Sequence, residues 1–261
     1  KITKLDVATY YQYIAKWMLP YIKNRLLTLV RCPANYKQAF YQKHEDSKTS
    51  TLKKLRVKEK KSADYIYLTD PKALIELAQM SVLEIHPWES QIKKLEKPDV
   101  IIFDIDPDTN IPWKKVVAAA FDVKEQLAKY KLQSFVKTTG GKGLHVVIPI
   151  KPEYDWQTVK DFARIFVEYM VTNNPKLYVS KMSKSLRKGK IFLDYLRNQR
   201  GATAIAPYSL RARIHAPVAT PIAWNELTDN FKDTFFTIKT IAKRLDNLKD
   251  DPWKNFYEVK Q

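Results

Sequence analysis

The chain has 261 residues, of which 45% are hydrophobic and 12% aromatic, so it is long enough and apolar enough to form a globular core and is not a disordered chain. No stretch of about 18 consecutive apolar residues occurs, which excludes a membrane-spanning helix. The 46 lysines and arginines outnumber the 28 acids and give a net charge of +18, which favours a polyanionic partner, most often nucleic acid. Anionic lipid is a rival partner, but no basic amphipathic helix stands out, and a merely soluble basic surface is the third interpretation.

The single cysteine, Cys32, cannot form an internal disulfide, which suits a reducing cytoplasm. It follows an apolar, strand-like run, and we interpret it as a packing residue. No signal-peptide pattern is found, and the first residue is Lys1 rather than methionine. We therefore expect a piece of a longer, cytoplasmic protein that has no contact with a membrane.

The N-terminal third of the chain is predicted to contain short strands and helices. Apolar residues at helical spacing predict an amphipathic helix over 6–19, which Pro20 follows. The further elements predicted up to residue 88 are strands at 26–31, 39–42, 65–68 and 82–88, and a helix capped by Asp70 that ends at Met80. Residues 43–61 differ from the rest, because eight lysines and arginines stand there against three acids. Such a segment is usually a solvated, mobile loop, but it is equally suited to gripping phosphates.

The most informative stretch is the apolar run 100–103 and the acids that follow it. The run predicts a strand that is buried on both faces. Asp104 and Asp106 follow at i and i+2, so both carboxylates point to one face, and Pro107 ends the strand. Two like charges at the rim of a buried strand repel each other, and a Mg²⁺ or Mn²⁺ ion between them relieves the repulsion. The pattern predicts a metal site, and the alternative is a solvated turn with two acids.

The remaining elements complete one alternating pattern. They are helices at 113–130 and from Asp155 to about residue 170, strands at 134–137, 144–150 and 191–196, and one more helix within the last forty residues. From residue 82 onward the order is strand, strand, helix, strand, strand, helix, strand. This order favours an α+β sheet with helices on one face over a parallel wound sheet.

Three further features carry candidate chemistry. Asp194 is a third carboxylate at an apolar strand, so three acids from two strands could hold two divalent ions, although Asp194 alone would more simply pair with Arg197. The glycine turn around Lys142 allows a close backbone approach to a phosphate, but it is not a Walker loop, and in isolation it is only a β-turn with a lysine. His145 follows this turn. A single histidine on a strand is more often structural, but its place after a glycine turn and near acids also fits a hydrogen-bond donor to a phosphate.

Together these residues resemble the polymerase domain of bacterial ATP-dependent DNA ligase D, a member of the archaeo-eukaryotic primase superfamily. The matching motifs, in chain order, are Leu-Glu-Ile-His-Pro-Trp (83–88), Phe-Asp-Ile-Asp-Pro (103–107), Phe-Val-Lys-Thr-Thr-Gly-Gly-Lys-Gly-Leu-His-Val-Val (135–147), Phe-Leu-Asp-Tyr-Leu-Arg-Asn (192–198), Arg-Gly-Ala-Thr-Ala (200–204) and Tyr-Ser-Leu-Arg-Ala-Arg (208–213). The resemblance implies an α+β, primase-like fold: an RRM-like antiparallel sheet with flanking helices and a second, small α/β subregion. It implies a single primase-polymerase domain over 1–261, with an N-terminal subregion at about 1–81, a catalytic core at about 82–215 and a helical tail at about 216–261.

The resemblance also implies a function and a set of partners. It implies a template-directed nucleotidyltransferase that fills and extends DNA ends in non-homologous end joining, with a preference for ribonucleotides. Its cofactors would be two divalent ions, Mn²⁺ or Mg²⁺, and its substrates nucleoside triphosphates and double-stranded DNA ends or gaps with a 5′-phosphate. Ligase and nuclease domains of the same chain and a Ku-type end-binding protein are further implied partners, and the location would be the bacterial cytoplasm, at the nucleoid.

The family's functional residues carry over onto matching positions of this sequence. The metal-binding, catalytic acids would be Asp104, Asp106 and Asp194. The incoming nucleotide would be held by His86, Thr139, Lys142, His145, Arg197 and Arg211. DNA would be contacted by Lys4 at a downstream 5′-phosphate, Phe40 by stacking and Arg187 on the template side. One position departs from the family motif, which usually reads Thr-Ser-Gly-Gly where Thr139 replaces the serine, and its added methyl group could alter the sugar contact.

Two alternative functions fit parts of the sequence. A haloacid-dehalogenase-type phosphatase also has an apolar strand before Asp-x-Asp, but it expects threonine where Asp108 stands, and no paired acids follow on a suitable later strand. A catalytically silent module that binds DNA ends through its basic loops belongs to a different class. Extension of a primer distinguishes the polymerase from both.

Overall fold

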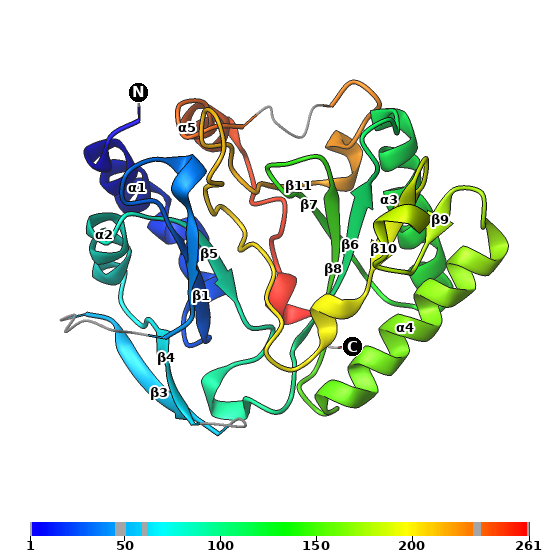
Figure 1. Ribbon diagram of the computed structural model, residues 1–261, viewed down its shortest axis with the longest axis horizontal. Helices are drawn as coiled ribbons and strands as arrows, with labels where there is room; N and C mark the ends of the chain where they lie inside the picture. The colour runs from blue at the N-terminus through cyan, green and yellow to red at the C-terminus, as the bar shows by residue number, and fades with distance from the viewer. Residues whose placement is uncertain (1, 45–50, 59–61, 232–235, 260) are drawn as a thin grey trace. The chain divides into compact units, whose positions relative to one another are not determined.

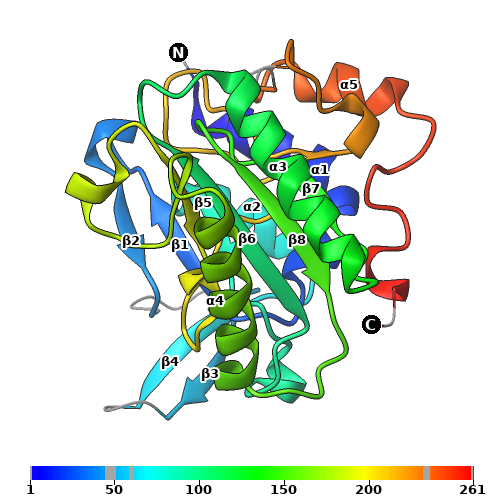
Figure 2. The same cartoon turned by 90° about the vertical axis from the view of Figure 1, so that its right-hand side faces the viewer.

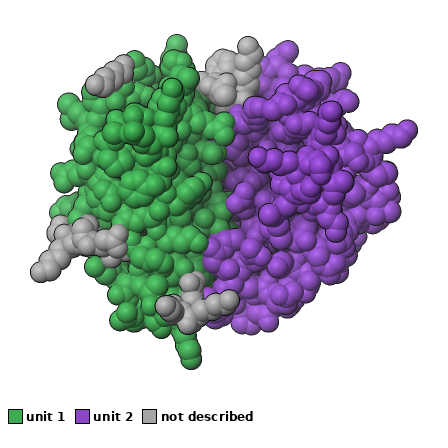
Figure 3. Space-filling view, in the orientation of Figure 1, with its two compact units in different colours: residues 1–95, 203–220, 236–248 green, residues 96–202, 221–235, 249–261 purple. Residues whose placement is uncertain are grey.

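The computed structural model describes residues 2–44, 51–58, 62–231, 236–259 and 261. The chain forms two compact units, which Figure 3 shows in different colours. Unit 1 comprises residues 1–95, 203–220 and 236–248, and unit 2 comprises residues 96–202, 221–235 and 249–261. Each unit is therefore assembled from three separate stretches of chain. The expected subregions, with boundaries at about residues 81 and 215, are consecutive stretches of sequence, whereas the two units are defined by their compactness in space. The expected subdivision stays a prediction.

Unit 1 is built on a five-stranded antiparallel sheet (Figure 1). Its strands are β1 (Leu27–Arg31), β2 (Phe40–Gln42), β3 (Lys53–Val57), β4 (Ala63–Tyr67) and β5 (Val82–Pro87). They are ordered β2-β1-β4-β3, and β5 also pairs with β1. The helices of this unit are α1 (Lys4–Ile22), α2 (Lys72–Gln79) and α5 (Ile241–Asn247). The strands predicted for the N-terminal third are thus confirmed with small shifts at their ends, and so is the presence of both helices. The N-cap of α2 is Pro71 and not Asp70, although Asp70 Oδ1 accepts a hydrogen bond from the Lys72 amide.

Helix α1 begins at a capping box and runs further than the sequence predicts. The Thr3 hydroxyl accepts a hydrogen bond from the Asp6 amide, and the Asp6 carboxylate accepts one from the Thr3 amide. The helix continues through Pro20 to Ile22, so the expected end before this proline is wrong. Proline lacks an N–H and removes one helical hydrogen bond. Burial of Tyr21 and Ile22 in the last turn compensates for this loss.

The lysine-rich segment 43–61 contains a strand, which corrects its interpretation as a loop. Residues 53–57 form β3 and pair with β4 over five positions, from Lys53↔Tyr67 to Val57↔Ala63. Val57 is buried, whereas Lys53, Lys54 and Arg56 are exposed, so this edge strand offers too few apolar residues to show the usual alternation. Residues 45–50 and 59–61 lie outside the described residues. The suggestion that the segment grips phosphates stays a prediction.

Unit 2 is built on a six-stranded sheet with the order β11-β7-β8-β6-β10-β9. Its elements are β6 (Val100–Pro107), α3 (Trp113–Lys129), β7 (Phe135–Thr138), β8 (Leu144–Pro149), α4 (Trp156–Asn173), β9 (Tyr178–Val179), β10 (Ile191–Asp194) and β11 (Pro221–Ile222). Strands β6, β7, β8 and β10 pair antiparallel and follow a β-α-β-β-α-β order with the two helices. This is the RRM-like core that the family resemblance implies. Strand β10 ends at Asp194, before the predicted end at residue 196.

Helices α3 and α4 cover the same face of this sheet (Figure 2). The Phe103 ring on β6 lies 4.7 Å from the Phe166 ring on α4, measured between ring centres. Because side chains alternate along a strand, Asp104 and Asp106 point to the opposite face. The helix-covered face is therefore the apolar core of unit 2, and the other face carries the acids. No helix in the described part of the chain is long and apolar enough to cross a membrane.

Candidate active site

Four polar side chains form one row across four neighbouring strands of unit 2. In the antiparallel register, Lys137 on β7 stands opposite His145 on β8, His145 opposite Asp104 on β6, and Asp104 opposite Asp194 on β10. Directly opposite residues of an antiparallel pair share a face of the sheet. Asp106 lies two residues beyond Asp104 and so belongs to the same face. The structure thus brings the three predicted acids together.

Two arginines lie against these acids. Arg197 Nε is 3.3 Å from Asp104 Oδ2 and 3.4 Å from Asp194 Oδ2. Arg187 Nη1 donates a hydrogen bond of 3.2 Å to Asp106 Oδ2. Asp194 is therefore both the partner of Arg197 and a neighbour of Asp104, so the two roles considered for it from sequence are compatible. Each acid of the site has a guanidinium group beside it.

The residues of this row determine the protonation of its two central members, Asp104 and His145. Burial alone would raise the pKa of Asp104, but His145, Arg197 and Lys137 outweigh burial and hold this pKa at about 2. Burial and the charge of Lys137 lower the pKa of His145 to about 4, against the opposing effect of Asp104. His145 Nε2 lies 3.5 Å from Asp104 Oδ1. At neutral pH the pair is a carboxylate beside a neutral imidazole, so His145 can donate a hydrogen bond to a phosphate but adds no charge.

The two other acids hold their protons more tightly than usual. Burial and the charge of Asp104 raise the pKa of Asp106, and burial raises the pKa of Asp194, with a further contribution from Asp104. Among the described residues, no group of three or more His, Cys, Asp or Glu side chains is arranged as a metal site. The donor set nevertheless fits hard divalent ions, because these ions prefer carboxylate oxygens and would remove the repulsion between the acids.

The glycine turn between β7 and β8 is held closed by Thr139. Its amide and its hydroxyl both donate to the Gly143 carbonyl, at 3.2 and 3.0 Å. A Cβ atom on Gly143 would lie 2.3 Å from the Ile105 carbonyl oxygen, so only glycine allows this turn to pack on β6. Gly140 has a φ of +63°, a conformation that glycine adopts without strain. Lys142 is exposed on the turn.

The two other predicted nucleotide-binding residues lie in unit 1 and share one acid. Glu84 Oε2 is 2.8 Å from His86 Nε2, and Glu84 Oε1 accepts hydrogen bonds from Arg211 Nε at 3.1 Å and from the Ala212 amide at 2.8 Å. The Glu84 side chain is 7% exposed. Burial would raise its pKa, but His86, Arg211 and the Ala212 amide together lower it to about 2.

This shift makes the stability of the protein depend on pH. Glu84 stays ionised in the folded state down to pH about 2, whereas in the unfolded chain it takes up a proton near pH 4.5. The interaction therefore stabilises the folded state fully above pH 4.5, and this stabilisation is lost as the pH falls toward 2. Its full contribution to the unfolding free energy is about 3 kcal/mol. We expect the difference in unfolding free energy between the wild type and Glu84→Gln to shrink over this interval. Urea unfolding at several pH values, followed by tryptophan fluorescence, measures this difference, and a difference independent of pH would contradict the assignment.

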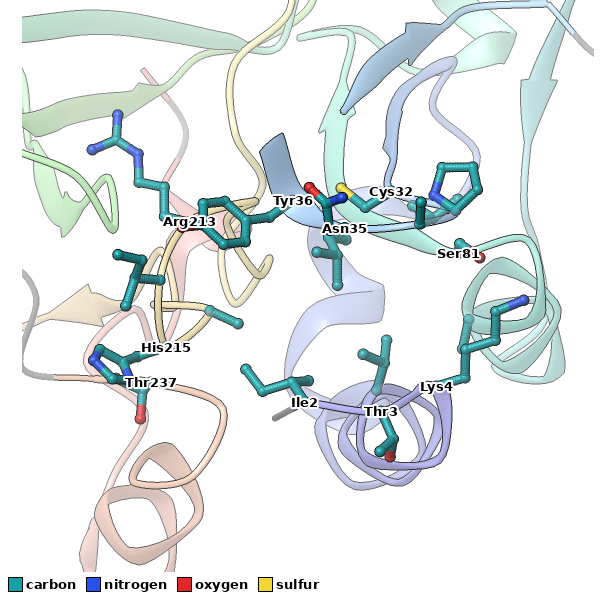
Figure 4. A pocket seen from close by; sticks show the side chains of 18 of the residues that line it. Ile2, Thr3, Lys4, Cys32, Asn35, Tyr36, Ser81, Arg213, His215 and Thr237 are labelled. Carbon is teal, nitrogen blue, oxygen red and sulfur yellow. The ribbon is translucent and has the colours of Figure 1, made fainter. Parts of the chain in front are cut away.

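Two of the residues expected to contact DNA also lie in unit 1. Lys4, at the start of α1, lines a cavity of about 720 Å³ (Figure 4). Its Nζ donates a hydrogen bond to the Gln79 carbonyl at 3.1 Å. The cavity is further lined by side chains of the loop after β1 and by Arg213, His215 and Lys239. Phe40 on β2 is 45% exposed and lies under the guanidinium group of Arg31. Lys4 and Phe40 are thus accessible on unit 1, while Arg187 belongs to unit 2.

Sequence reasoning missed two residues of these clusters. Glu84 lies in the motif at 83–88 without an expected role, although its place two residues before His86 puts both side chains on one face of a strand. Lys137 is 1% exposed, and its position in the row depends on the register of β7 and β8. Spacing along a strand could have revealed Glu84, but no sequence signal gives the register that reveals Lys137.

Comparison with known proteins identifies the family. The family model described as the LigD primase-polymerase domain matches residues 3–253. The chain belongs to this family. The polymerase domain of Mycobacterium tuberculosis ligase D, solved in complex with DNA, superposes on it with a TM-score of 0.90 and 28% sequence identity, covering 98% of this chain and 92% of that one.

Curated relatives of this LigD primase-polymerase domain are larger proteins. The multifunctional non-homologous end joining protein LigD of Pseudomonas aeruginosa is 33% identical over 267 residues, which cover 99% of this chain and 31% of that protein. The bifunctional LigD of Bacillus subtilis is 29% identical over 263 residues, which cover 100% of this chain and 42% of that protein. The chain therefore spans less than half the length of either relative. Membership in the LigD family confirms the predicted resemblance, the primase-like α+β fold and the enzyme class, a DNA-directed nucleotidyltransferase.

Proposed function

We propose that this domain adds nucleotides to a primer end on a DNA template and so fills and extends broken ends in non-homologous end joining. The observation that carries the proposal is the row of Asp194, Asp104 and His145 on the face of the unit 2 sheet opposite helices α3 and α4, with Asp106 beside it. Such a row presents carboxylate oxygens and a neutral hydrogen-bond donor within a few ångströms of one another. The names of the relatives, which are end-joining proteins, support the proposed pathway.

The three acids are proposed to form the catalytic centre. Asp104, Asp106 and Asp194 would hold two divalent ions, Mn²⁺ or Mg²⁺, whose chemistry is Lewis-acid stabilisation of the attacking and leaving oxygens. The primer 3′-hydroxyl would attack the α-phosphate in line, and pyrophosphate would leave. Because Asp104 has a pKa of about 2, it is ionised throughout the physiological range. Arg197 contacts two of the acids and is placed to share its charge with a phosphate.

Each unit contains residues that we propose as nucleotide-binding on the basis of the family resemblance. In unit 2 these are Arg197, His145, Lys142 on the glycine turn, and Thr139, whose hydroxyl closes that turn. In unit 1 they are His86 and Arg211 on the Glu84 carboxylate. We propose a preference for ribonucleotides with Thr139 near the sugar, where its methyl group would adjust the fit.

DNA is the proposed polymeric substrate, as a double-stranded end or gap with a 5′-phosphate. The net charge of +18 supplies a sequence-independent hold on phosphates. Lys4 would bind the downstream 5′-phosphate, and the exposed Phe40 ring would stack on a template base. Arg187, which stacks on the Phe192 ring at 3.7 Å, would act on the template side. The solved relative was captured with DNA, which supports this partner.

The cellular setting is also a proposal. The longer relatives support linked ligase and nuclease domains, and an end-binding protein of the Ku type would bring the domain to a break. A cytoplasmic location at the nucleoid follows from a DNA substrate in a bacterium. The net positive charge supports contact with chromosomal DNA.

Primer extension on a gapped duplex with a 5′-phosphate tests the proposed activity. We expect templated addition of one nucleotide with Mn²⁺ or Mg²⁺, faster with ribonucleoside than with deoxyribonucleoside triphosphates. The same duplex without the 5′-phosphate is the control for the proposed role of Lys4 and should be extended less efficiently. Equal rates with both sugars would overturn the ribonucleotide preference alone. Absence of templated addition with every nucleotide and both metals would overturn the function.

A further inference from the structure

The Glu84 carboxylate in unit 1 is surrounded by hydrogen-bond donors. Its two oxygens accept from three groups: the His86 ring at 2.8 Å, Arg211 Nε at 3.1 Å and the Ala212 amide at 2.8 Å. The residue is only 6% exposed. A buried carboxylate is costly unless its lone pairs are satisfied, and here both oxygens have donors. One anion therefore connects two side chains that are distant in sequence.

The fold builds this arrangement along both edges of β5. On one edge, β5 pairs with β1, which places Glu84 opposite Val30. On the other edge, the Ala206 amide donates to the Ile85 carbonyl at 2.9 Å, and the Ile85 amide donates to the Ser209 hydroxyl at 2.9 Å. The segment 206–212 thus runs beside β5 and takes the place of a neighbouring strand.

The same segment is fixed just beyond the strand. The Arg211 amide donates to the Pro217 carbonyl at 2.8 Å, which holds the backbone of Arg211 in a turn. Glu84 and His86 stand two residues apart on β5 and share a face. The carboxylate therefore meets His86 from its own strand and Arg211 from the neighbouring segment.

We propose that Glu84 is a positioning residue that holds His86 and Arg211 in one fixed arrangement for the triphosphate of the incoming nucleotide. This inference rests on the proposed function of His86 and Arg211. A long arginine side chain has many rotamers, and fixing it before the ligand arrives lowers the entropy lost on binding. The contact with Glu84 also places a proton on His86 Nε2, which determines the tautomer of the ring. Replacing the acid should therefore disorder both residues at once.

Glu84→Gln tests the proposal, because it keeps the shape and replaces one acceptor oxygen by an NH₂ group that faces donors. We expect the KM for the nucleoside triphosphate to rise by about tenfold or more and kcat to change by less than about threefold, since binding in the ground and transition states is lost together. In the double variant Glu84→Gln/His86→Ala the rise in KM should be smaller than the product of the two single rises, because residues that act as a unit are not additive. Asp64→Asn, which removes an exposed acid of the same sheet, is the matched control and should keep the wild-type KM.

A second measurement does not depend on catalysis. The ¹⁵N resonances of the His86 ring report its tautomer, and we expect them to show one tautomer in the wild type and a mixture in Glu84→Gln. Glu84→Asp keeps the charge, so its KM should lie between that of the wild type and that of Glu84→Gln. If Glu84→Gln does not fold, Glu84→Asp is the variant to be measured in its place. A folded Glu84→Gln variant with wild-type KM and wild-type His86 resonances would overturn the proposal. If the wild-type protein adds no nucleotide, the proposed function fails, and the resonances alone then decide whether Glu84 positions His86.

Discussion

Nucleotide addition is expected to fall by about 10³-fold or more when Asp104 is replaced by asparagine, while binding of the protein to DNA is retained. Asp104 is the centre of the site, because it stands opposite both His145 and Asp194 and lies 3.3 Å from Arg197. Its carboxylate is the acid of the site whose pKa lies at about 2, so the substitution removes a full negative charge. Losing one preorganised electrostatic group at a reacting centre typically costs about 10²- to 10³-fold, and losing a metal ligand with it costs more.

Single-turnover primer extension and a DNA-binding assay measure the two effects separately. Asp229→Asn is the matched control, because Asp229 is an exposed acid of the same unit that pairs only loosely with Lys114 at 3.7 Å. This variant should extend primers like the wild type. If Asp104→Asn extended primers at the wild-type rate, the three acids would not be the catalytic centre.

The second large effect is expected from Asn198→Ala, which should lower the unfolding free energy by about 3 kcal/mol or more. Asn198 is fully buried, and its amide group donates to the carbonyls of Ile102 and Tyr195 and accepts from the Ile102 amide, at 2.7, 2.9 and 2.8 Å. Strand β10 ends at Asp194, so no residue of β10 stands opposite Ile102 on β6. The Asn198 side chain binds the backbone N–H and C=O of Ile102 in its place. Alanine leaves the buried Ile102 groups without partners, and each unsatisfied group costs about 1–3 kcal/mol.

Chemical denaturation measures this loss, and Gln199→Ala serves as its control. Gln199 is the next residue in the chain and is exposed, so its replacement should change the unfolding free energy by less than about 0.5 kcal/mol. Because Asn198 follows Arg197, the alanine variant should also weaken nucleotide addition. A loss of stability below about 1 kcal/mol would show that water replaces the amide group.

The order of elements in unit 2 could be predicted because its strands and helices have strong, different periodicities. The apolar run before Asp104 and the amphipathic patterns of α3 and α4 are long enough to be recognised individually. Two-residue strands such as β9 and β11 are too short to show a recognisable pattern of apolar residues, so they could not be predicted. In unit 1, β3 could not be predicted, because lysine and arginine occupy its exposed positions and leave too few apolar residues to show the alternation of a strand.

The candidate site could be predicted in part. Asp104 and Asp106 share a face because they are two residues apart, and this follows from strand geometry alone. That Asp194, 90 residues later, stands directly opposite Asp104 depends on the register of β10 against β6, which spacing does not determine. The pairing of Glu84 with Arg211 was unpredictable for the same reason, since 127 positions separate them.

The segment that covers the outer edge of β5 has a consequence for biosynthesis. Ser209 leaves the ribosome 124 residues after Ile85, which corresponds to roughly 6–25 s at typical rates of translation. During this interval the outer edge of β5 in the nascent chain is unpaired, and an unpaired edge can form backbone hydrogen bonds with a strand of another chain. Glu84 and His86 place polar groups on that strand, and such side chains discourage wrong pairing between edges. We therefore expect Glu84 also to discourage pairing of this edge with another chain while the polypeptide is being made.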